Sequence, residues 1–133
     1  MITLDTSGVF ALLNREDPDH ARTAKALADD PGPYVLPAGI LSEVGYLVGR
    51  RLGWDVLDAL LQDVQDGSFA LDDGEADIPR IRELVARYAD LPLGFADAAV
   101  VACAERRGGR VLTLDQRDFA VVAREGKITP VPG

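Results

Sequence analysis

The stretch FADAAVVACAERR, residues 95–107, is apolar on almost every side of a helix, and the apolar strand RVLTL, residues 110–114, follows it closely. A helix without a polar stripe belongs in the interior of a domain. A strand without polar alternation is covered on both faces. This helix–strand pair therefore predicts the centre of an α/β domain, with Cys103 as a small core residue.

Short apolar strands alternate with helical stretches along the rest of the chain. Strands are predicted at 2–4, 34–36, 69–71 and 128–131, and helices at 6–14, 18–29, 38–52, 57–64 and 78–88, with a short helical turn at 118–119. This alternation predicts a parallel sheet with helices on both faces. Because no repeat or long linker divides the sequence, we expect one domain spanning residues 1–133.

Local signals refine three of these helices. Thr6 or Ser7 can cap the first helix, and Pro18 suits the first turn of the second. Gly45 and Gly49 each weaken the helix over 38–52 by about 1 kcal/mol relative to Ala. Such glycines are tolerable where another helix packs closely, so they mark a candidate interface.

Composition limits the classes of function. The 133 residues carry a net charge of −8, which argues against a protein that coats nucleic acid. The arginines form local groups that we interpret first as solvated helix ends and second as phosphate contacts. No apolar run is long enough to cross a membrane. With no secretory pattern and a single cysteine, we expect a cytoplasmic protein.

Four acidic residues lie where burial is expected. Asp5 and Asp115 each close an apolar strand, while Glu43 and Asp97 lie inside apolar helical stretches. A buried carboxylate needs a paired cation, and none of the four has Lys or Arg beside it. Ligands bind beyond the carboxyl ends of parallel strands, where all four positions can meet. We therefore predict one acidic pocket that binds a divalent metal, Mg²⁺ or Mn²⁺.

Each acid also has a simpler interpretation. Asp5 could be a helix cap, Asp115 a turn residue, Asp97 a partner of the helix dipole and Glu43 a solvated side chain. These interpretations do not explain why all four lie at one rim. A zinc site is excluded because the chain has one cysteine and one histidine, and we expect His20 to be solvated.

The motifs around these acids resemble those of a known family. Leu4–Ser7, Ser42–Val44, Phe95–Ala98 and Leu112–Asp115, followed by Arg117–Phe119, resemble the four motifs of PIN-domain ribonucleases. The similarity is greatest to the VapC toxins of bacterial toxin–antitoxin pairs. It extends over essentially the whole chain, with the motifs in the same order and spacing.

The resemblance implies a three-layer α/β/α sandwich and Mg²⁺- or Mn²⁺-dependent endonucleolytic cleavage of RNA. It implies a homodimer and a cognate VapB-like antitoxin. Asp5 and Asp97 would be the principal metal ligands, with Glu43 and Asp115 completing the catalytic pocket. The accessory residues implied are a further acid and three hydroxyl groups near the site: Asp118, Thr6, Ser7 and Thr113.

We expect hydrolysis by a metal-activated water, with arginines drawing in the RNA backbone. One alternative is a catalytically silent PIN-like module that only binds a partner. A less favoured alternative is a phospho-receiver domain, which also gathers acids at strand ends. That fold needs a lysine after a late strand, and Lys127 lies in a polar turn instead.

Overall fold

Five short strands pair in parallel to form one sheet in the computed structural model, which describes residues 1–133. Their order is β3-β2-β1-β4-β5, so β1 lies at the centre. The strands are β1 (Ile2–Leu4), β2 (Tyr34–Pro37), β3 (Phe69–Asp72), β4 (Arg110–Leu112) and β5 (Thr129–Val131).

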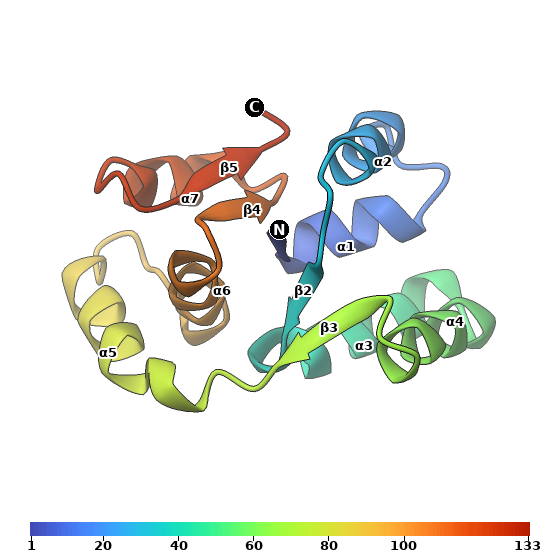
Figure 1. The fold of residues 1–133 in the computed structure, drawn as a ribbon, viewed down its shortest axis with the longest axis horizontal. Coiled ribbons are helices and arrows are strands. Elements are labelled where there is room, and N and C mark those ends of the chain that lie inside the picture. The colour runs from blue at the N-terminus through green and yellow to red at the C-terminus, as the bar shows by residue number, and fades with distance from the viewer.

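Helices cover both faces of this sheet, as predicted, in a three-layer α/β/α sandwich (Figure 1). Right-handed crossovers place α1 to α4 on one face and α5 to α7 on the other. The helices are α1 (Thr6–Leu13), α2 (His20–Ala28), α3 (Leu41–Leu52), α4 (Trp54–Gln65), α5 (Ile78–Arg87), α6 (Phe95–Arg106) and α7 (Gln116–Ala123), with 3-10 turns η1 (Ala38–Ile40) and η2 (Glu75–Asp77).

The chain changes direction between β1 and β4, which are neighbours in the sheet. After β1, the chain adds β2 and then β3 on one side of β1. It then returns to add β4 and β5 on the other side of β1. Thr3 of β1 pairs with Val35 of β2 and with Val111 of β4. A crevice opens beyond the carboxyl ends of strands at such a reversal. Asp5 and Asp115 follow the two strands that form it.

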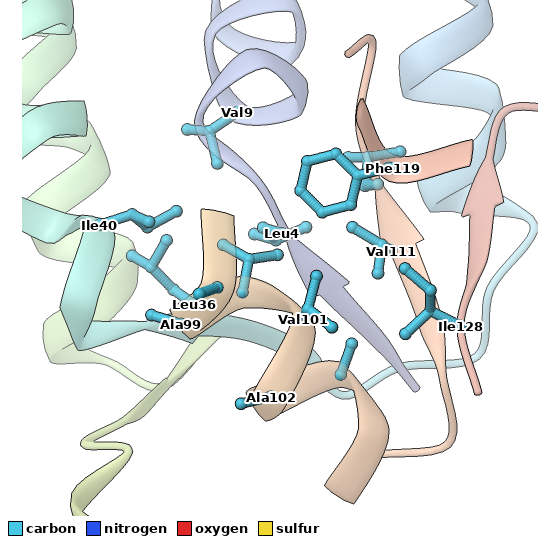
Figure 2. Close-up of a cluster of buried hydrophobic side chains, with 14 of the residues drawn as sticks. Leu4, Val9, Leu36, Ile40, Ala99, Val101, Ala102, Val111, Phe119 and Ile128 are labelled. Atoms are coloured by element: carbon cyan, nitrogen blue, oxygen red, sulfur yellow. The ribbon is translucent and has the colours of Figure 1, made fainter. Parts of the chain in front are cut away.

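Helix α6 packs across β1, β2 and β4 and supplies much of the core (Figure 2). Residues 98–104 are all buried, as their continuous apolar sequence predicts. Cys103 is among them and is a core residue, as expected. Phe119 of α7 is fully buried in the same cluster as Val101 of α6 and Leu4 of β1. The helices that carry Asp97 and Asp118 are therefore fixed to one hydrophobic core.

The glycines of α3 serve packing within the chain. Leu57 of α4 lies against them, and a Cβ added at Gly49 would come within 3.2 Å of its Cδ2 atom. The surface considered above as a candidate interface is thus covered by α4. Gly8 of α1 shows an even closer approach, because a Cβ there would lie 2.3 Å from the carbonyl oxygen of Leu112.

Several predicted helix boundaries were wrong. Asp5, rather than Thr6 or Ser7, occupies the N-cap position of α1. Helix α2 begins at His20, since Asp17 first forms a turn by accepting a hydrogen bond from the Asp19 amide at 2.8 Å. The helical turn expected at 118–119 is the full helix α7.

The interpretation of the arginine groups as solvated helix ends was wrong for four of their members. Arg106 and Arg107 both pair with Asp72, while Arg80 pairs with Glu105 and Glu125. Arg106 also pairs with Asp77, and Arg110 pairs with Asp30. These arginines join elements of the fold, so they are not free to bind phosphate.

None of the helices combines the length and the apolar character that crossing a membrane requires.

Candidate metal centre

Five acidic side chains are positioned around the carboxyl ends of β1 and β4. Asp5 follows β1, Asp115 is the N-cap residue of α7, and Asp118 lies in the first turn of that helix. Asp97 lies in the first turn of α6, which runs antiparallel to β4 and so begins at this edge. Glu43 lies in the first turn of α3 and is exposed.

Three of these carboxylates form a tight cluster. Oxygen atoms of Asp97, Asp115 and Asp118 all lie within 4.8 Å of one another. The pKa of Asp97 is raised to about 6, first by burial and then by the negative charges of Asp5, Asp115, Asp118 and Glu43. Asp5 and Glu43 are not members of this cluster, but both lie close enough for their charges to act on Asp97.

Asp5 is held by two hydroxyl groups. Thr113 Oγ1 donates a hydrogen bond to Asp5 Oδ2 at 2.8 Å, and Ser7 Oγ donates to the same oxygen at 2.9 Å. Burial raises the pKa of Asp5, and these two hydrogen bonds partly offset the effect. Because both hydroxyls bind Oδ2, Asp5 Oδ1 is left without a side-chain hydrogen bond.

The same hydroxyls bind the loop that carries the neighbouring acid. Ser7 Oγ accepts a hydrogen bond from the Leu114 amide at 2.9 Å, and Thr113 Oγ1 accepts one from the Asp115 amide at 3.0 Å. The Asp5 amide donates to the Leu112 carbonyl at 3.0 Å. This network connects the ends of β1 and β4 and fixes Asp5 relative to Asp115.

Thr6 differs from Ser7 and Thr113. Its hydroxyl oxygen is buried and has no hydrogen-bond partner. Asp5 makes no side-chain capping hydrogen bond to α1, although it occupies the N-cap position. Its carboxylate is therefore directed to Ser7 and Thr113, which argues against a role only in capping.

None of the five acids forms an ion pair with lysine or arginine. The other buried carboxylates behave differently, since Asp30, Asp72 and Asp77 each pair with at least one cationic group. Sequence inspection missed these three acids. Asp72 ends β3 much as Asp5 follows β1, so its position in the sequence resembles that of a site residue. Its ion pairs with Arg106 and Arg107 are what distinguish it from the acids around the carboxyl ends of β1 and β4.

Asp97, Asp115 and Asp118 offer only carboxylate oxygens, which are the ligands that hard cations such as Mg²⁺ and Mn²⁺ prefer. Crowded and unpaired negative charges favour binding of such an ion. Asp118, ranked below the other acids from the sequence, belongs to the closest group. The helical periodicity of α7 was the missed signal, because it places residues 115 and 118 one turn apart.

Two further residues lie away from this centre. His20 is half-buried, and its ring nitrogen Nδ1 hydrogen-bonds to the Ala11 carbonyl at 2.9 Å, so it is partly engaged in the fold. Lys127 precedes β5 and lies at the amino edge of the sheet, opposite the acids. It cannot serve as the lysine of a phospho-receiver site.

Comparison with known proteins identifies the family. The PIN domain family matches residues 2–125. The chain belongs to the PIN-domain family. A curated member, Ribonuclease VapC26 of Mycobacterium tuberculosis, is 33% identical over 133 residues, covering 97% of this chain and 98% of that protein. The predicted VapC-type ribonuclease is thereby confirmed.

Three solved structures share the fold of this chain. VapC20 of Mycobacterium tuberculosis, described as a sarcin-ricin loop cleaving toxin, is 24% identical with a TM-score of 0.79 and covers 91% of this chain and 95% of its own. VapBC2 of Rickettsia felis, bound to a promoter DNA fragment, has 16% identity, a TM-score of 0.70 and coverages of 98% and 97%. FitAcB of Neisseria gonorrhoeae has 19% identity, a TM-score of 0.65 and coverages of 98% and 96%.

Proposed function

We propose that this PIN-domain protein is a Mg²⁺-dependent endoribonuclease and the toxin of a type II toxin–antitoxin pair. The single observation that carries this proposal is the convergence of five carboxylates, none of which forms an ion pair with lysine or arginine. Similarity to Ribonuclease VapC26 supports RNA as the substrate. A catalytically silent module would have no need to keep these charges together at the cost of their mutual repulsion.

The proposed ion is Mg²⁺, with Mn²⁺ as a substitute. Asp5 and Asp97 are the proposed principal ligands, and the closeness of Asp115 and Asp118 to Asp97 makes both of them further candidates. When bound, the ion supplies Lewis acidity and neutralises charge at the scissile phosphate. Ligation favours the ionised form of Asp97, whose pKa of about 6 is already below neutral pH.

The protein's own side chains have distinct parts in this scheme. Ser7 and Thr113 fix one oxygen of Asp5, which leaves the other oxygen for the ion. Glu43 is exposed at the rim, where it can accept a proton from the attacking water. Asp115 is held by the hydrogen bond from its amide to Thr113 Oγ1 and lies in the tight cluster with Asp97 and Asp118.

The proposed partners are an RNA substrate, a second copy of the chain and a VapB-like antitoxin that covers the acidic centre. Two observations support the antitoxin. The solved relative from Rickettsia felis is a VapBC2 assembly, and an uncovered cluster of carboxylates offers a site for a basic side chain of a partner.

The test is RNA cleavage by the purified chain with Mg²⁺, Mn²⁺ or EDTA. We expect cleavage with either metal and none with EDTA. Asp5→Asn and Asp97→Asn should abolish cleavage while the proteins stay folded, because each substitution removes a ligand and relieves repulsion. Glu16→Gln, which changes an exposed acid beyond α1, is the matched control and should cleave as the wild type does.

Undiminished cleavage in EDTA, or by either asparagine variant, would refute the proposed mechanism. A wild-type protein that binds RNA and antitoxin but never cleaves RNA would instead identify the chain as a silent binding module.

A further inference from the structure

Half of the twelve arginines are already engaged in ion pairs within the fold. Ion pairs occupy six of them: Arg22, Arg80, Arg87, Arg106, Arg107 and Arg110. Arg50 and Arg51 form no ion pair, are both exposed and are adjacent in sequence. They are therefore a local source of free positive charge on a protein of net charge −8.

These arginines end the helix that begins at the acidic centre. Glu43, Tyr46 and Arg50 are spaced by three and four residues, so they lie along one face of α3. The distance from residue 43 to residue 50 along a helix is about 10 Å. Tyr46, between them, is 68% exposed.

Contact with α1 fixes the position of one of the cations. The guanidinium carbon of Arg51 lies 5.9 Å from the ring centroid of Phe10, a cation–π distance. Helix α1 begins just after Asp5. Helices α1 and α3, which both begin near the acidic centre, are therefore in contact where α3 ends in Arg50 and Arg51.

We infer that the face of α3 formed by Glu43, Tyr46 and Arg50, together with Arg51 beside it, binds the single-stranded RNA that flanks the scissile phosphate. An exposed aromatic ring beside free cations is the combination that binds unpaired bases and their phosphates. An unpaired base stacks on Tyr46, and Arg50 and Arg51 bind the next phosphates. This inference rests on the proposed function, because it takes the acidic centre as the cleavage site.

Steady-state cleavage of a short single-stranded RNA tests the stacking contact. Tyr46→Ala should raise KM roughly ten-fold or more and leave kcat unchanged, because the contact lies outside the acidic centre. Tyr46→Phe keeps the ring and should behave as the wild type. Unchanged KM for Tyr46→Ala, or equal effects of Tyr46→Phe and Tyr46→Ala, would overturn the stacking role.

Salt dependence tests the phosphate contacts independently of turnover. Fluorescence anisotropy of the same RNA is measured on an Asp97→Asn background, which does not cleave. Arg50→Gln and the double variant Arg50→Gln/Arg51→Gln should each lower the slope of log Kd against log salt by about 0.7 per lost phosphate contact. Arg82→Gln changes an exposed, unpaired arginine of α5, on the opposite face of the sheet, and is the matched control (Figure 1).

The antitoxin is the other partner that could bind this face of α3. Wild-type KM and salt slope in the Tyr46 and Arg50 variants, combined with loss of inhibition by antitoxin, would overturn the RNA assignment and make the face a protein-docking surface. A wild-type protein that neither binds nor cleaves RNA would contradict the proposed function itself.

Discussion

At the scale of single residues, unequal environments distinguish acids of the same type. Asp5 is buried with two hydroxyl donors, Asp97 is half-buried among like charges, and Asp72 is buried with arginines. Burial and repulsion raise the pKa of Asp97, whereas hydrogen bonds from Arg106 lower the pKa of Asp72 to about 2. The first two acids have no cationic partner and are the proposed ligands of the metal ion, whereas the third is already neutralised.

The metal-free protein should become less stable as the pH rises from about 4 to about 6. Asp97 has a folded pKa of about 6 and an unfolded pKa near 3.8, so within this window the folded state binds more protons than the unfolded state. Asp97→Asn should remove this dependence and stabilise the metal-free protein at pH 7 by about 1 kcal/mol, allowing for solvent screening. Urea unfolding in EDTA at several pH values measures both effects, and an unaltered pH profile in the variant would contradict them.

Thr113→Val should weaken Mg²⁺ binding by roughly ten-fold. The substitution keeps the shape of the side chain but removes the hydroxyl that donates to Asp5 Oδ2. Thr113→Ser keeps a hydroxyl and should bind the metal nearly as well as the wild type. Titration calorimetry with Mg²⁺ measures the affinity. Equal affinities for the valine and wild-type proteins would show that Thr113 does not position Asp5.

At the scale of helices and strands, the sequence predicts most elements because their apolar periodicity is strong. The apolar stretch of α6 and the unbroken strands β1 and β4 predict the central layer, and the acids that follow the strands predict the site. The boundaries are less predictable where a local turn competes, as at Asp17 before α2. Close packing is also hidden, because sequence alone does not show that Leu57 covers Gly49.

Gly8→Ala should destabilise the protein by about 1–3 kcal/mol, since the added methyl group would overlap the Leu112 carbonyl oxygen at the end of β4. Gly45→Ala is the matched helix control. A Cβ there meets only Leu57 Cδ1 at 3.9 Å, an ordinary contact, so this change should stabilise the protein by about 0.5–1 kcal/mol. Denaturant unfolding compares the two variants, and equal effects would contradict the close approach of α1 to β4.

At the scale of the whole molecule, ion pairs join parts of the chain that the sheet leaves separate. Arg106 at the end of α6 binds Asp72 at 2.8 Å, just past the middle of the chain, and also binds Asp77. Arg80 connects α5 to Glu105 of α6 and to Glu125 beyond α7. Such pairings between distant residues, like the order of the strands, leave no periodic signal, so sequence inspection could not predict them.

Asp72→Asn should reduce stability at pH 7 by about 2 kcal/mol, because the folded pKa of about 2 is well below the unfolded value of 3.8. For a lowered pKa, the stabilisation is complete above pH 4 and is lost as the pH falls towards 2. The difference between variant and wild type should therefore shrink over that range. Asp73→Asn, an exposed neighbour, is the control. A difference that stays constant from pH 7 to pH 2 would exclude the ionised Asp72 as its source.

The hydrogen bond between Asp5 and Thr113 spans 108 positions of the chain. During translation, Asp5 leaves the ribosome long before Thr113 and Asp115 have been made. A nascent chain or an early truncation product therefore lacks a complete acidic centre. The acidic centre can assemble only when synthesis is nearly complete, so the activity proposed for it appears last.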